Sequence, residues 1–124
     1  DMNAAMVDIM DNRQRADEFA YYVALELKGK ITSHGKTAKA TAEAIRRPTA
    51  TMNRWLNGKL PLPLSVLCEA CEFLEIDPTS VVQNAYDRLA IRRGERNGKQ
   101  YDEDSKLIAL EEQQELENLK PSVW

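Results

Sequence analysis

The 124-residue sequence contains only two cysteines, Cys68 and Cys71, three positions apart. It therefore has no framework of long-range disulfides, a composition typical of a reducing compartment. No apolar run approaches the ~20 residues that a membrane-spanning helix needs. The first twelve residues mix apolar side chains with three aspartates and lack the basic and apolar regions of a secretion signal. These absences predict a cytoplasmic protein with no membrane partner, and the length suits one compact domain with about 30 residues to spare.

The sequence also lacks the motifs that carry catalysis. It contains no phosphate-binding loop, no metal-ligand cluster and no nucleophile with a base at a recognisable spacing. The C-x-x-C pair Cys68 and Cys71 has no second ligand pair and no strand before it, so we expect both thiols in the core. His34 precedes a glycine in an expected loop without an acidic partner. We therefore expect a protein that is not an enzyme, with no catalytic residue, metal or cofactor.

Acidic residues outnumber lysines and arginines, which gives a net charge of −3, but the positive charge is strongly segregated along the sequence. Residues 28–59 hold eight lysines and arginines, with Glu43 as the single acid. Residues 88–99 hold five cations and one acid. By contrast, residues 60–87 have five acids and no base, and residues 100–124 have seven acids and two bases. This segregation predicts one positive face suited to a polyanionic partner.

Apolar residues recur at three- and four-residue steps, and no strand pattern is present, which predicts an all-α fold. The predicted helices cover residues 13–32, 37–45, 48–56, 63–75, 78–93 and 102–119. Residues 2–10 either extend the first helix or form a separate short one. Thr37 and Asp77 are expected caps, and Asn57-Gly58 is a helix-stop signal. The helix over 63–75 is apolar nearly all round, so we expect it to be the most buried.

The most informative part is the pair of short helices joined by a tight turn at Arg46-Arg47-Pro48. In the second helix of the pair, Met52, Trp55 and Leu56 share one face. Small and polar side chains occupy the other face: Thr49, Ala50, Asn53 and Arg54. Trp55 is at helical spacing from Met52, which favours a core anchor over a side chain that stacks on a base.

Residues 17–90 resemble the lambda-repressor-like (Cro/CI-type) helix-turn-helix domain, especially the versions in phages and actinobacteria. The residues that carry the resemblance keep fixed offsets from Gly58: Ala42, Ile45, Thr51, Met52, Trp55, Asn57, Pro61, Val66, Ala70, Phe73 and Ile76. It implies a five-helix bundle, here with an additional C-terminal helix. The expected organisation is an N-terminal extension (1–12), the helix-turn-helix DNA-binding domain (13–93), a flexible basic linker (94–101) and an acidic helix (102–124).

The sequence departs from the family pattern around the turn. Thr41 replaces a leucine, Arg46 a glycine and Arg47 an apolar residue, so we expect this turn to be built differently. Ala38 replaces a glutamine that contacts phosphate in the family. Lys36 or Lys39 is the expected substitute for that contact.

The residue types favour a helix that enters the major groove of DNA, because amides and hydroxyls read base edges and small side chains permit close approach. The predicted base-reading residues are Thr49, Ala50, Asn53 and Arg54. The predicted phosphate contacts are Lys36, Thr37, Lys39, Arg46, Arg47 and Lys59. The second basic run is either a solvated helix end or a second DNA contact, through Arg88, Arg92, Arg93, Arg96 and Lys99.

The expected function is that of a sequence-specific regulator that binds a double-stranded DNA operator in the nucleoid of a bacterial host. Its resemblance to temperate-phage immunity repressors implies repression by operator occupancy. The alternative is an antitoxin-like interaction module that binds DNA for autoregulation. Two architectures remain open: a homodimer paired through the C-terminal helix, and a monomer with a second DNA contact at residues 88–99.

Overall fold

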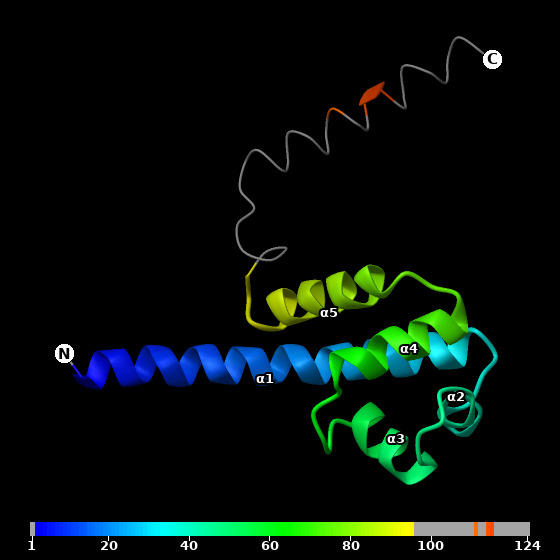
Figure 1. Cartoon of the computed structure of the whole chain (residues 1–124). Coiled ribbons are helices and arrows are strands. Elements are labelled where there is room, and N and C mark those ends of the chain that lie inside the picture. The colour runs from blue at the N-terminus through cyan, green and yellow to red at the C-terminus, as the bar shows by residue number, and fades with distance from the viewer. Residues whose placement is uncertain (1, 96–110, 112–113, 116–124) are drawn as a thin grey trace. The chain divides into compact units, whose positions relative to one another are not determined.

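The computed structural model describes residues 2–95, 111 and 114–115, and within these residues every regular element is a helix (Figure 1). The helices are α1 (Met2–Ser33), α2 (Ala38–Ala44), α3 (Thr49–Leu56), α4 (Leu64–Leu74) and α5 (Pro78–Arg92). The all-α prediction is therefore confirmed. The predicted helix over 102–119 lies almost entirely outside the described residues. None of the described helices combines the length and the apolar character needed to cross a membrane.

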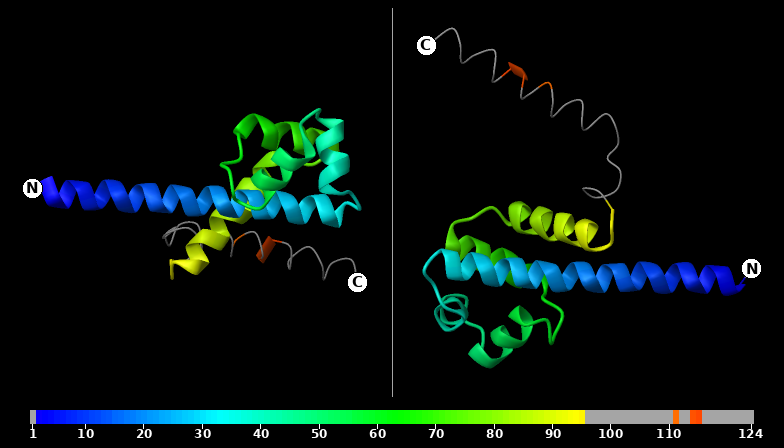
Figure 2. Two further views of the ribbon diagram at one scale, coloured as in Figure 1. Left: turned by 90° about the horizontal axis from the view of Figure 1, so that it is seen from below. Right: turned by 180° about the vertical axis from the view of Figure 1, so that it is seen from behind.

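The chain divides into two compact units, residues 1–89 and 90–124. In the first unit, α2, α3 and α4 lie together on one side of the C-terminal half of α1, as the left view shows (Figure 2). The core contains Leu27 and Ile31 from α1, Met52 and Leu56 from α3, and residues of α2, α4 and α5. In the second unit, α5 ends at a turn in which the Glu95 amide donates to the Ala90 carbonyl at 2.7 Å.

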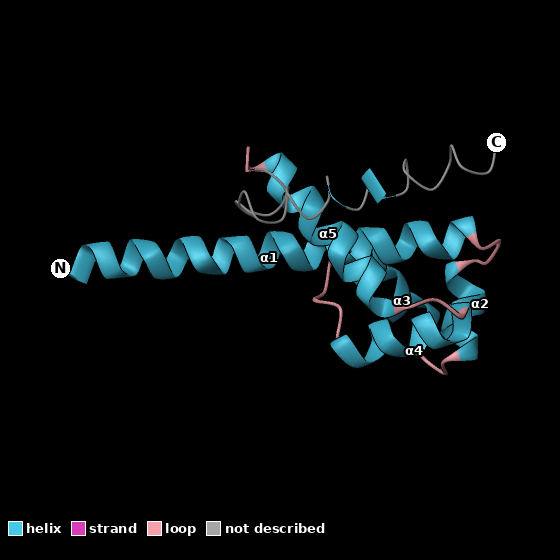
Figure 3. Ribbon diagram, turned by 90° about the horizontal axis from the view of Figure 1, so that it is seen from above, coloured by secondary structure: helices cyan, strands magenta, loops and turns pink. Residues whose placement is uncertain are grey.

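The first helix is a single element of 32 residues, so residues 2–10 extend it rather than forming a separate helix. All side chains from Met2 to Gln14 are exposed, whereas Ala24, Leu27 and Ile31 are buried. Figure 3 shows the N-terminal part of α1 running well past α2, α3 and α4. One helix thus has a projecting segment and a core-forming segment.

The caps predicted from sequence are present. The Thr37 hydroxyl accepts a hydrogen bond from the Ala40 amide at 3.0 Å, which satisfies an otherwise unpaired donor at the start of α2. A carboxylate oxygen of Asp77 accepts from the amide and the hydroxyl of Thr79, at 2.9 and 2.8 Å. These two hydrogen bonds lower the pKa of Asp77, because they stabilise its charged form.

The fourth helix has the largest buried share of residues, since Val66, Leu67, Ala70, Cys71 and Leu74 are all buried. It is nevertheless amphipathic, because Leu64 is 72% exposed and Cys68 is exposed one turn further along. The prediction that both cysteines lie in the core is therefore wrong for Cys68. It occupies the face of α4 that turns away from the other helices, which the apolar composition of this segment concealed.

Candidate nucleic-acid interface

The second and third helices are joined by a turn of four residues whose geometry depends on Arg46. This residue has φ of +57°, in the left-handed region that favours glycine. Its amide donates to the Glu43 carbonyl at 3.2 Å, and the Arg47 amide donates to the Ala42 carbonyl at 2.9 Å. These paired bonds end α2 by the Schellman arrangement. An arginine thus adopts here a conformation that a glycine adopts without strain, and whether the turn differs from that of the family stays a prediction.

The third helix has two distinct faces. Met52 and Leu56 are 0% and 1% exposed and belong to the core, and Trp55 packs against that core while partly accessible. On the opposite side Ala50 and Asn53 are exposed. Because its apolar underside is anchored, α3 presents this outer face in a fixed orientation.

The four predicted base-reading residues differ slightly in exposure. Ala50, Asn53 and Arg54 are exposed, while Thr49 is partly buried at the first position of α3. Pro48 precedes this position as the N-cap, with ψ of 135°, so α3 begins one residue later than predicted. The exposed side chains offer an amide, a guanidinium and a methyl group to a partner.

Four of the predicted phosphate-contacting cations, Lys36, Lys39, Arg46 and Lys59, are exposed; Lys39 lies in the first turn of α2, and the other three lie in the segments before or after α2 and α3. The Lys36 ammonium lies 5.5 Å from the centre of the Phe73 ring, which restrains it without neutralising it. The remaining two candidates have other partners. The Thr37 hydroxyl caps α2, as described above. The Arg47 guanidinium bonds to the Glu69 carboxylate at 2.7 Å and so links the turn to α4.

The sequence prediction missed one contact of the interface. The Lys28 ammonium of α1 donates to the Asn57 side-chain oxygen at 2.7 Å, at the C-terminal end of α3. Its charge belongs to the basic segment noted in the sequence, but no local spacing places Lys28 beside Asn57. This contact is tertiary and is set by the packing of α1 against α3.

The second basic run is only partly described. Within the first unit, the Arg88 guanidinium lies 3.7 Å from the Glu26 carboxylate and 5.6 Å from the centre of the Tyr22 ring. Arg88 thus helps attach α5 to α1. Arg92 and Arg93 fall in the second unit, and Arg96 and Lys99 lie outside the described residues. A second DNA contact at residues 88–99 stays a prediction.

Cys71 and His34 are of residue types that are common in catalytic and metal sites, and their surroundings are as follows. Burial raises the pKa of the Cys71 thiol to about 11, which keeps it protonated at neutral pH. The His34 ring nitrogen Nδ1 lies 2.8 Å from the Lys30 carbonyl, at the end of α1. Among the described residues, no group of three or more histidine, cysteine or acidic side chains is arranged to hold a metal ion.

Comparison of the chain with protein families, curated proteins and solved structures finds no match. We therefore interpret α2, the turn and α3 from the contacts and exposures described above alone.

Proposed function

We propose that this chain is a double-stranded DNA-binding protein that reads sequence through the outer face of α3. The observation that carries the proposal is the contrast across this helix. Met52 and Leu56 are buried beneath it, while Ala50, Asn53 and Arg54 are exposed, and exposed cations precede and follow the helix in the sequence. An amide and a guanidinium are suited to base edges, and lysines and arginines are suited to phosphates.

More specifically, we propose that the chain is a transcriptional repressor of the temperate-phage immunity type, which blocks promoter access by occupying its operator. The proposal is supported by the left-handed conformation of Arg46 between α2 and α3, since glycine, the residue that the family pattern has near this position, adopts such a conformation without strain. Lys36, Lys39, Arg46 and Lys59 supply affinity, and Asn53 supplies discrimination. Because Arg47 is bound to Glu69, its proposed role is to hold the turn while remaining near the phosphates.

The test is selection of bound sequences from random duplex DNA with the full chain, which reports site length, symmetry and specificity together. We expect an enriched sequence and a logarithm of affinity that falls linearly with the logarithm of salt concentration. Failure to enrich any duplex would overturn the proposal.

The role of Asn53 is tested on the selected site. Asn53→Ala should cost about 1 to 3 kcal/mol at that site and leave nonspecific binding unchanged. Asn84→Ala is the matched control, because Asn84 is also an exposed asparagine but lies on α5. If Asn53→Ala preserves the ratio of specific to nonspecific affinity, Asn53 is not a base-reading residue.

A further inference from the structure

The projecting part of α1 exposes more apolar surface than any other helix segment that the structure describes. Met2, Met6, Val7, Ile9 and Met10 are between 54% and 82% exposed. Contiguous exposed apolar surface of this kind on a soluble protein marks an interaction site. The question is which partner this surface fits.

Three of the exposed residues, Met2, Met6 and Ile9, belong to a stripe that runs along α1 into the body of the first unit, whereas Val7 and Met10 lie outside it. Steps of four and three residues connect Met2, Met6, Ile9, Arg13, Ala16, Ala20 and Val23, and the next step reaches the buried Leu27. Such a seven-residue repeat keeps all these positions on one face of a helix that pairs with another helix. The side chains of the stripe change in size along α1. Those in its first third are large, and those in its middle are alanines.

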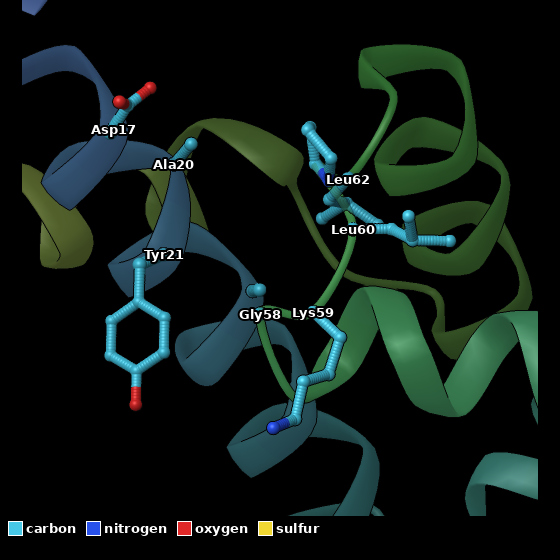
Figure 4. A pocket seen from close by; sticks show the side chains of 9 residues that line it. Asp17, Ala20, Tyr21, Gly58, Lys59, Leu60 and Leu62 are labelled. Atoms are coloured by element: carbon cyan, nitrogen blue, oxygen red, sulfur yellow. The ribbon is translucent and has the colours of Figure 1, made fainter.

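The alanines line two adjoining hollows beside α1. One hollow, of about 240 Å³, lies between Ala16, Ala20 and Val23 on one side and Leu62, Leu64 and Val82 on the other. The other, of about 330 Å³, places Asp17, Ala20 and Tyr21 against the connector from Gly58 to Leu62 (Figure 4). Ala20 and Leu62 line both hollows, so the two hollows adjoin each other. We refer to them together as the depression along the middle of α1.

We propose that the first third of α1 docks antiparallel into this depression on a second copy of the chain, forming a symmetric dimer. In that arrangement Met6 packs near Val23, and Ile9 near Ala20, of the other copy. The large side chains fill the space that the alanines leave, and both copies do so at once. A two-fold interface requires this kind of self-complementary surface.

One charged residue of the stripe, Arg13, and Asp17, which lies one turn further along beside the stripe, match the same arrangement. Arg13 and Asp17 are both exposed and lie on either side of the expected two-fold axis, one turn apart. An antiparallel pair therefore brings Arg13 of each copy to Asp17 of the other, so opposite charges meet twice. This match between positions of a single helix favours a second copy over an unrelated partner as the occupant.

The inference concerns association without DNA and does not rest on the proposed function. Sedimentation velocity of the full chain over a concentration series, in the absence of DNA, should show a monomer–dimer equilibrium. Met6→Ala and Ile9→Ala should each weaken dimerisation about tenfold, the size expected of a central interface residue. Asp8→Ala is the control on the opposite face of α1 and should leave the equilibrium unchanged. A wild-type chain that stays monomeric at all concentrations overturns the proposal, whether or not it binds DNA.

A charge exchange separates this interface from any other dimer contact. Arg13→Glu and Asp17→Arg should each abolish the homodimer, since each places like charges together at both contacts. An equimolar mixture of the two variants should form a heterodimer, because every contact is then again between opposite charges. Circular dichroism melting checks that both variants remain folded. Dimers that persist in either single variant, or a mixture that stays monomeric, would show that α1 does not pair in this way.

Discussion

The outer face of α3 is polar, and the opposite face of the same helix is apolar and packed in the core. The first third of α1 instead exposes apolar side chains, and no part of this segment is packed against the core. In α3, Met52 and Leu56 are almost fully buried and fix the exposed side chains in place. In α1, Met6 is 57% exposed and its neighbours are similarly accessible. A surface of the first kind is preorganised for a polar ligand, while a surface of the second kind gains stability only by being covered.

The largest expected effect comes from the same substitution made in both regions. Met52→Ala should lower the free energy of unfolding by about 2 to 5 kcal/mol, because it leaves a cavity in the core. Met6→Ala should change it by less than about 0.5 kcal/mol, because an exposed helix position loses little on truncation. Urea denaturation of dilute protein, where any dimer is dissociated, measures both. A loss above about 1 kcal/mol for Met6→Ala would show that the stripe is packed within a single chain.

Local signals explain why most of the fold was predictable from sequence. The cap at Thr37, the prolines at 48 and 63 and the stop at Asn57-Gly58 act within a few residues of the boundaries that they set. The observed ends of α2, α3, α4 and α5 fall within two residues of the predicted ends. The two faces of α3 follow equally from its helical period, and Met52 and Leu56 are buried as expected.

Long-range contacts explain what was not predictable. The pairing of Arg47 with Glu69 and of Lys28 with Asn57 joins residues far apart in the chain. The exposure of Cys68 depends on which face of α4 the other helices cover. The left-handed conformation of Arg46 was not predictable either, since an arginine carries no local preference for it.

A smaller effect is expected at Gly58, where the end of α3 meets the middle of α1. This residue ends α3 with φ of +74°, and an added Cβ would collide with the Tyr21 ring of α1. Gly58→Ala should therefore cost about 1 to 3 kcal/mol of stability. The double variant Gly58→Ala with Tyr21→Ala should recover part of that loss, because it removes the collision but not the backbone strain. Thermal unfolding of the three variants tests this, and full additivity of the two changes would show that the ring is not the obstacle.

The smallest expected effect concerns Arg46, which precedes α3. It distinguishes a role of this residue in stability from a role in DNA binding. Arg46 and Glu75 are the two non-glycine residues with positive φ among those described, at +57° and +58°, and each follows a helix. Replacing either with glycine removes about 1 to 2 kcal/mol of strain and adds about 0.5 to 1 kcal/mol of unfolded-state entropy. Both Arg46→Gly and Glu75→Gly should thus stabilise the chain by up to about 1.5 kcal/mol.

The same two variants should differ in DNA binding. Arg46→Gly removes a proposed phosphate contact, so the slope of log affinity against log salt should fall by about 0.9 and all sequences should bind more weakly. Glu75→Gly has the same backbone effect at the end of α4 but removes no cation, and its slope should equal that of the wild type. Equal slopes for all three proteins would show that Arg46 serves the turn alone. The cationic flank of α3 would then rest on Lys36, Lys39 and Lys59.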